Sequence, residues 1–531
     1  MDLNLPLLLL AGFSSLGLAF RSGILKPRSW DWFAVACVVL VAGGVTALVA
    51  FDVAGLVAFA LWALFVLCPI LLSRLQARLL MTQRYDAVYA AGWVLALLHP
   101  SKPFRANVAR VRALRAAAAG DRTAAERALD AYAAFGAAAA AEARLERVRL
   151  GVDPDEVRTA VLALEDARTA RGPVVAFGMV RALAEIGDLP GAIGRYRLSE
   201  PLFEPEPAEA LRTSGCLVLF AATGRVADVD VVLGARLRPA SSALKDFWRA
   251  CALYAAGDPD GERALRGFAG STDGLLRRGA IIRLASPRFS PEQLTPADIT
   301  LLDRLALRIT QEDRFRFGSR RRTVPWVCHG LALVTALVFV LGEVVYFAER
   351  SRGISRERVL EQMGALSATA VIEGGEYWRL VAPLFLHYGA AHAIFNLLGL
   401  YFLGPFVERA LGRERFLLTY FGSGLAGTVL YVLRAQYLTA PDDFIARHTI
   451  LVGASGAIMG LLGATIAVLA RGALGRKIPA ARRRLAIVGM ILVLQMVFDQ
   501  LIAQISSFAH TVGALAGLAL GFLLSTGDKR R

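Results

Sequence analysis

Long apolar runs at both ends of the chain, around a more charged middle, restrict its fold more than any other feature. A helix needs about 20 consecutive apolar residues to cross a bilayer. Within the hydrocarbon, only helices and closed barrels satisfy every backbone polar group. Because 56% of the 531 residues are hydrophobic and the runs are continuous, we predict an all-α, polytopic membrane protein with a soluble helical part.

Nine segments have the length and character of membrane-spanning helices. They run over Leu3–Phe20, Trp32–Phe51, Val53–Leu72, Trp326–Phe347, Pro383–Phe406, Phe416–Leu433, Ile450–Ala470, Leu485–Ile505 and Phe508–Ser525. Their grouping predicts three transmembrane helices in residues 1–73, a soluble α-helical domain in residues 74–322 and a six-helix membrane domain in residues 323–531.

The net charge of +16 has two readings, a nucleic-acid partner or a membrane topology signal. Arginines gather beside apolar spans, as at Arg320–Arg322 and Arg482–Arg484. Lys and Arg next to membrane helices are retained on the cytoplasmic side. The charge pattern therefore disfavours nucleic acid as a partner, and it predicts that the domain of residues 74–322 is cytoplasmic.

The middle region alternates Ala and Leu with charged residues at helical spacing, as in residues 122–135. Glycine-centred turns recur every 31 to 37 residues, at Gly120, Gly151, Gly187, Gly224 and Gly257. A period of this length is typical of helical-hairpin solenoids, and the stretch Leu183–Arg197 resembles the turn of a tetratricopeptide repeat. The alternative is a plain Ala-rich helical domain. A repeat domain would bind a protein or peptide partner on its concave face.

Metal and cofactor chemistry find little support. The five cysteines are scattered without a CxxC pair, which indicates neither a disulfide framework nor a zinc site. His392 and Asn396 are four residues apart and share a helix face, and His387 is expected where that helix begins. Ala391 and Ala393 flank His392, so the glutamate of an HExxH zinc site is missing. We predict no metal and no cofactor.

Two glycine stripes carry the remaining polar groups of the C-terminal spans. Ser455 stands between Gly453 and Gly456, with Gly460 and Gly463 beyond, and this motif alone is explained by close helix packing. His510 opens a second stripe that continues at Gly513, Gly517 and Gly521. If the two stripes pack together, the serine hydroxyl can reach the imidazole. A base at that position makes serine a competent nucleophile.

Taken in order, these motifs resemble the rhomboid intramembrane proteases. They are Trp378-Arg379, His387-x4-His392-x3-Asn396, GxSG at Ser455 and AHxxGxxxG at His510. The resemblance covers about Val324 to Thr526, and it implies a six-helix rhomboid-like core.

The resemblance also implies a role for each matching residue. Ser455 would be the nucleophile and His510 the general base, while the Ser455 amide, His392 and Asn396 would hold the oxyanion. His387 and Gly453 would line the site, and the remaining matches are structural: Trp378, Arg379, Glu408, Gly456, Gly513 and Gly517. The family uses a Ser–His dyad, and we expect no buried carboxylate placed to orient His510. An aromatic residue often packs on the histidine from a position that here is Met459.

These features together predict a serine endopeptidase of a bacterial inner membrane. It would hydrolyse peptide bonds in or near the transmembrane helices of other membrane proteins, within the lipid bilayer. One alternative is a catalytically weak or inactive rhomboid-like membrane scaffold that binds client proteins through its repeat domain. A transporter is disfavoured because no inverted repeat is visible. An aspartyl intramembrane protease would need paired Asp residues within spans, where only Asp499 comes close.

Overall fold

The computed structural model describes most of the chain. The described residues are 4–23, 29–99, 101–151, 153–165, 172–204, 208–235, 237–313, 324–438, 449–475, 479–501 and 506–525. They form two compact units, Met1–Leu307 and Arg308–Arg531, which are taken separately below. Over the described residues the secondary structure is helical, with one isolated β-bridge.

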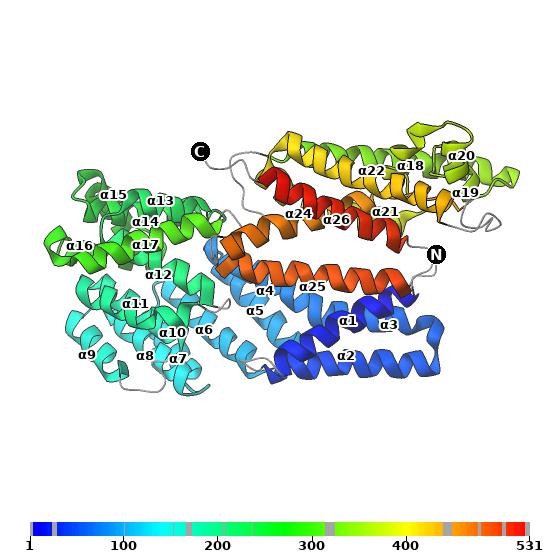
Figure 1. The fold of residues 1–531 in the computed structure, drawn as a ribbon. Coiled ribbons are helices and arrows are strands. Elements are labelled where there is room, and N and C mark those ends of the chain that lie inside the picture. The colour runs from blue at the N-terminus through cyan, green and yellow to red at the C-terminus, as the bar shows by residue number, and fades with distance from the viewer. Residues whose placement is uncertain are drawn as a thin grey trace. The chain divides into compact units, whose positions relative to one another are not determined.

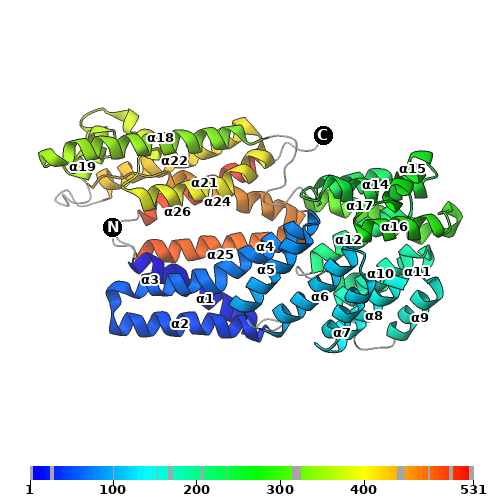
Figure 2. The same ribbon diagram turned by 180° about the vertical axis from the view of Figure 1, so that it is seen from behind.

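The first unit begins with a bundle of apolar helices (Figures 1 and 2). They are α1 (Asn4–Gly23), α2 (Trp30–Val49) and α3 (Phe51–Trp62), which continues through a π-helical turn η1 (Ala63–Leu67) into α4 (Cys68–Met81). Small residues let α1, α2 and α3 pack closely: Gly43 faces Ala58, and the amide of Gly55 donates to Asn4 Oδ1 at 2.5 Å. The helix that contains α4 continues past residue 73, where the sequence placed a domain boundary.

The remainder of the first unit is a series of shorter helices. They are α5 (Tyr85–Leu98), α6 (Lys102–Ala118), α7 (Arg122–Ala133), α8 (Ala137–Gly151), α9 (Pro154–Glu165), α10 (Pro173–Glu185), α11 (Leu189–Phe203), α12 (Glu209–Ala222), α13 (Val226–Ala235), α14 (Ser242–Ala255), α15 (Pro259–Ala269), α16 (Gly274–Ala285) and α17 (Pro296–Asp313). Consecutive helices pack on one another as antiparallel neighbours, for example α6 with α7, α10 with α11 and α14 with α15.

The predicted glycine turns separate these helices. Gly120, Gly187, Gly224 and Gly257 all have φ between +69° and +82°, which favours glycine and ends the preceding helix. After Gly120 and two of the others an aspartate caps the next helix; Asp121, for example, accepts from the Ala124 amide at 2.8 Å. Gly151 ends α8, and the adjacent Val152 lies outside the described residues. The resemblance to tetratricopeptide repeats stays a prediction.

The second unit is a bundle of long helices around α24 (Figure 1). Its elements are α18 (Trp326–Glu349), α19 (Arg356–Gln362), α20 (Ala368–Ile372), α21 (Ala390–Leu411), α22 (Arg413–Tyr437), α24 (Ser455–Ala470), α25 (Pro479–Leu501) and α26 (Ser507–Leu524). Helix α24 contacts α21, α22, α25 and α26. In the apolar part of the span that contains α24, 67% of the residues are buried, against 6% for the span that contains α18. The central position of α24 places its first residue, Ser455, within the bundle.

Seven helices of the described part are long and apolar enough to cross a membrane. They run over Trp30–Val49, Phe51–Met81, Trp326–Arg352, Ala390–Leu411, Arg413–Tyr437, Ser455–Gly475 and Ser507–Leu524. The other two predicted spans also form helices, α1 and α25. The apolar part of α1 is shorter, and α25 carries Arg482–Arg484 and Asp499. The chain is thus an integral, multi-pass membrane protein with a soluble helical region.

Two predicted spans begin later in the structure than in the sequence analysis. Residues 382–389 form a short 3-10 turn and a loop, so α21 begins at Ala390 rather than at Pro383. Residues 449–453 are not helical, and Leu451 pairs with Leu366 through two backbone hydrogen bonds of 2.9 and 3.0 Å. Helix α24 therefore begins at Ser455 rather than at Ile450. The arginines at 320–322 and the predicted boundary at residues 322–323 lie outside the described residues.

Candidate active site

Ser455 is the first residue of α24. The preceding Ala454 offers no side-chain cap, and the first amide bonded within the turn is that of Ile458, which donates to the Ala454 carbonyl at 3.0 Å. The leading amides of a helix have no intrahelical acceptor, and they carry the positive end of the helix dipole. The half-buried Ser455 hydroxyl therefore lies beside groups that can stabilise a negative oxygen.

Gly453 brings His392 close to this helix start. Its φ of +126° favours glycine, and its amide donates to the Pro383 carbonyl at 2.9 Å. A Cβ at Gly453 would lie 2.7 Å from His392 Nε2 and 3.5 Å from Ser455 Oγ. The serine and histidine side chains thus flank one small space that glycine leaves open.

The two glycine stripes pack against each other, as the sequence predicted. A Cβ at Gly513 would lie 2.2 Å from the Gly456 carbonyl oxygen, and one at Gly517 would lie 1.9 Å from that of Gly460. At the serine end of α24, a Cβ at Gly456 would lie 3.7 Å from the Ala509 carbonyl oxygen. The residue after Ser455 therefore contacts the residue before His510.

His510 has a carboxylate partner that the sequence analysis did not expect. Its Nδ1 lies 2.7 Å from Asp499 Oδ2, and both side chains are buried, at 8% and 2% exposure. The expectation that no buried carboxylate orients His510 is therefore wrong. Asp499 stands eleven residues before His510, on α25 rather than α26, so no spacing rule within a single helix links them. Its one signal in the sequence was an acidic residue inside an apolar span.

Asn396 of α21 and His387 of the loop before it both lie close to His392. Asn396 is buried and donates from Nδ2 to the backbone carbonyl of His392, one turn earlier, at 3.1 Å. His387 lies in the loop before α21, with its ring 5.1 Å from that of His392. Its Nδ1 is 3.1 Å from the Phe385 carbonyl, and its buried Nε2 has no hydrogen-bond partner among the described residues. His387 therefore lies beside His392 from the loop, three residues before α21 begins, and not at the helix start that was predicted.

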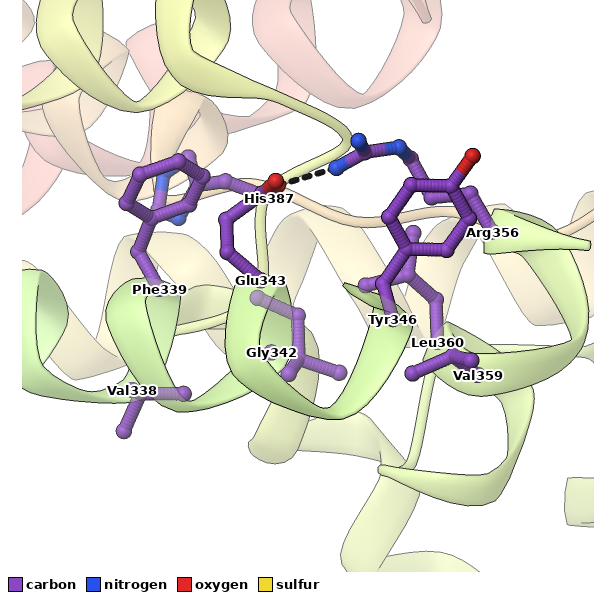
Figure 3. A pocket seen from close by; sticks show the side chains of 10 residues that line it. Val338, Phe339, Gly342, Glu343, Tyr346, Arg356, Val359, Leu360 and His387 are labelled. Atoms are coloured by element: carbon purple, nitrogen blue, oxygen red, sulfur yellow. Dashed lines mark hydrogen bonds and ion pairs between the residues drawn. The ribbon is translucent and has the colours of Figure 1, made fainter. Parts of the chain in front are cut away.

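A small pocket lies between α18 and the loop that carries His387 (Figure 3). In this view Glu343 of α18 and Arg356 of α19 point toward each other and form an ion pair. The Arg356 guanidinium also lies over the Tyr346 ring, 4.2 Å from its centroid. These contacts fix α19 on α18 on one side of the His387 loop.

The loop between α18 and α21 is held by Trp378 and Arg379. Arg379 donates to the carbonyls of Glu361 and Ala365, at 2.7 and 3.0 Å. The Trp378 ring fills the space beside Gly364, where a Cβ would lie 2.1 Å from the indole. Leu366 pairs with Leu451 just beyond this point. The contacts of Trp378 and Arg379 are therefore connected to the segment that leads into Gly453 and Ser455.

Glu408 anchors the start of α18 on α21. It is buried, and it accepts hydrogen bonds from the backbone amides of Val327 and Cys328, at 3.4 and 2.8 Å. A carboxylate at a helix N-terminus satisfies amides that have no acceptor within the helix and interacts favourably with the dipole. Met459 is buried in the hydrophobic core of the bundle. Within the described ranges, no three His, Cys, Asp or Glu side chains cluster as metal ligands.

Comparison with known proteins gives matches over this part of the chain. A family model described as Rhomboid domain matches residues 374–527. The putative rhomboid protease YdcA of Bacillus subtilis is 36% identical over 160 residues, covering 30% of this chain and 73% of the relative. The rhomboid protease GluP of the same organism is 30% identical over 214 residues, covering 40% and 38%.

A plant relative extends the match beyond bacteria. RHOMBOID-like protein 6, mitochondrial, of Arabidopsis thaliana is 34% identical over 167 residues. That alignment covers 31% of this chain and 49% of the plant protein. The match to YdcA covers nearly three quarters of that relative, and the residues that the family model matches include Ser455 and His510. The chain therefore belongs to the rhomboid family.

Proposed function

We propose that this protein is an intramembrane serine protease, with Ser455 as nucleophile and His510 as general base. The observation that carries the proposal is the glycine contact between α24 and α26, which sets Gly456 against Ala509. A nucleophile and a base on adjacent helices must be held within hydrogen-bond reach for acyl transfer. Side chains larger than hydrogen at the stripe positions would hold these helices apart.

The reaction divides into acylation and deacylation. In acylation the Ser455 hydroxyl gives its proton to His510 Nε2 as its oxygen bonds to the scissile carbonyl carbon, whose π electrons move to the carbonyl oxygen. His510 then gives the proton to the leaving nitrogen, the negative oxygen re-forms the carbonyl double bond, and the C–N bond breaks. In deacylation water repeats the sequence on the acyl-enzyme, with His510 as base and then acid.

The negative oxygen of the tetrahedral intermediate would bind at the N-terminus of α24. Nε2 of His392 and Oγ of Ser455 flank the space beside Gly453, and the Ser455 amide at the start of α24 would donate to the same oxygen. Asn396 would join them after exchanging its bond to the His392 carbonyl. Removing one donor of such a set typically costs about 10²–10³ in rate.

Substrates and topology belong to the same proposal. The substrates would be membrane proteins cut in or near a transmembrane helix. The three parts would be the helices of residues 1–73, a cytoplasmic repeat domain of residues 74–322 that binds a protein or peptide, and the catalytic domain of residues 323–531. The arginines beside the spans support this orientation in a bacterial inner membrane.

The test uses the full chain in liposomes with a reporter that carries one transmembrane helix. We expect the wild type to cut the reporter and Ser455→Ala to leave it intact. His510→Ala should abolish the cut as well, because the hydroxyl then lacks its base. A wild type that cuts no better than Ser455→Ala would overturn the proposal and favour the scaffold.

A further inference from the structure

Asp499 has two side-chain partners, one for each carboxylate oxygen. Oδ2 lies 2.7 Å from His510 Nδ1, and Oδ1 accepts a hydrogen bond from Gln495 Nε2 at 2.7 Å. Gln495 stands four residues earlier on α25, so it faces the same side of that helix. The side chain of Asp499 is 2% exposed. An acidic group so deeply buried in an apolar helix is costly unless it is paired, and it marks a functional position.

We infer that Asp499 is a positioning residue for His510, which holds the base of the Ser455–His510 dyad in the tautomer and orientation that the reaction needs. An ionised carboxylate can only accept hydrogen bonds, so with Asp499 ionised the contact is one in which His510 Nδ1 carries the proton and donates it. The neutral imidazole then has its lone pair on Nε2, the atom that must take the proton of Ser455. This inference rests on the function proposed above and adds a third residue to it.

The geometry gives Asp499 two effects on His510. It fixes the tautomer in which Nε2 is the acceptor, and it holds the ring in one rotation against α26. When His510 becomes an imidazolium during acylation, the buried carboxylate also stabilises the positive charge. No proton moves to Asp499 in any step. Gln495 holds the other carboxylate oxygen, which leaves Oδ2 directed at the ring.

The position of Asp499 also connects the base to a third helix. His510 lies near the start of α26, Ser455 opens α24, and Asp499 lies two residues before the end of α25. Helix α25 contacts both of the others. The arrangement of these three helices, rather than of two, would therefore determine whether the base is aligned.

The first experiment compares Asp499→Asn and Asp499→Glu in the full chain in liposomes with the transmembrane reporter. An Asn amide can donate to Nδ1 and so favours the tautomer with the proton on Nε2, which cannot act as base. We expect Asp499→Asn to lower kcat by about 10²–10⁴-fold and to change KM by less than about threefold. Asp499→Glu keeps the acceptor and should recover part of the loss. Asp52→Asn, the same change in α3, is the control and should match the wild type.

A second readout omits the substrate. Labelling of Ser455 by a fluorophosphonate probe reports the reactivity of the hydroxyl, and Asp499→Asn should slow it by a similar factor. If Asp499→Asn labels and cuts at the wild-type rate, the inference falls while the proposed function stands. If the wild type neither labels nor cuts, the proposed function falls, and the inference falls with it.

A third measurement needs no variant of Asp499 and decides the case if those variants do not fold. Nitrogen-15 chemical shifts of the wild-type histidines distinguish a protonated from an unprotonated ring nitrogen, and His510→Ala identifies the signals of His510. In the neutral form of the His510 ring we expect the proton on Nδ1 and none on Nε2. The opposite tautomer would overturn the inference.

Discussion

Gly517→Ala tests whether the site depends on the contact between α24 and α26. The added Cβ would lie 1.9 Å from the carbonyl oxygen of Gly460 and 2.4 Å from its Cα. Nonbonded heavy atoms prefer separations of about 3.5–4.0 Å, so the two helices must move apart by more than about 1 Å. Both obstacles are backbone atoms of a buried helix, which cannot rotate away as a side chain would. Overpacking of this kind typically costs about 1–3 kcal/mol, and we expect a value near the upper end.

The displacement should affect catalysis more than stability. Gly517 lies about two turns after His510 on the same face of α26, so a shift there moves the imidazole relative to Ser455. A misplacement of about 1 Å can cost about 10²-fold in rate. We expect the Gly517→Ala protein to remain folded and to lose about that much reporter cleavage.

The control is Gly489→Ala on α25, where a Cβ would meet no atom within 4 Å. Each protein is assayed for cleavage in liposomes and for thermal unfolding in detergent. The control should stay within about 0.5 kcal/mol of the wild type, as surface substitutions usually do, with unchanged cleavage. If Gly517→Ala matches the wild type in both thermal unfolding and reporter cleavage, the glycine stripes do not set the geometry of the site.

Three further predictions concern contacts away from Ser455. Glu408→Ala leaves two amides of α18 without an acceptor and should lower the free energy of unfolding by about 1–2 kcal/mol. Glu414→Ala, at an exposed position, should lower it by less than about 1 kcal/mol. Equal costs for the two variants would contradict the capping role of Glu408. Arg149→Met removes a buried guanidinium from the half-buried Glu185, which keeps its ion pair with Arg181, and should cost about 1.5–3 kcal/mol in chemical denaturation. Arg158→Met removes an exposed ion pair and should cost less than about 1 kcal/mol. Burial alone would raise the pKa of Glu185, but the charges of Arg149 and Arg181 outweigh it and hold that pKa below its usual range. The stability that the ionised Glu185 contributes is therefore present above about pH 4.3, the ordinary Glu pKa, and is lost as pH falls toward the folded-state pKa. Glu185→Gln should flatten the acid side of the plot of stability against pH. An unchanged acid side would refute the assignment.

Much of the fold could be predicted from the sequence because hydrocarbon allows few solutions. A run of about 20 apolar residues forms a helix in a bilayer whatever its exact order, so the apolar segments found in the sequence are helices in the structure. The packing of the glycine stripes could also be predicted, because glycine at every fourth residue leaves one helix face without side chains and lets another helix approach closely. Gly456 and Gly513 meet for this reason.

Helix starts were predicted less well, because the apolar sequence begins several residues before the backbone becomes helical. Pro383 and Ile450 both lie in apolar sequence, yet the helices begin at Ala390 and Ser455. The cause at α24 is the backbone of Gly453, whose positive φ is outside the helical region, and the pairing of Leu451 with Leu366. Hydropathy measures how well a segment suits the membrane. It carries no information about a tertiary contact that holds the preceding residues extended.

The contact between Asp499 and His510 shows where reasoning from single helices stops. Residues three or four apart on one helix share a face, so His392 and Asn396 could be grouped from spacing alone. Asp499 and His510 are on consecutive helices, and whether they meet depends on the rotation of each helix about its axis. The glycine stripe fixes that rotation for α26, because only one face of it fits α24. With α26 so fixed, His510 faces away from the lipid. A polar residue at the adjacent end of α25 avoids the cost of burial only if it faces His510. A buried acid near the end of the helix before a catalytic histidine is therefore better interpreted as a partner of that histidine than as half of an aspartyl pair.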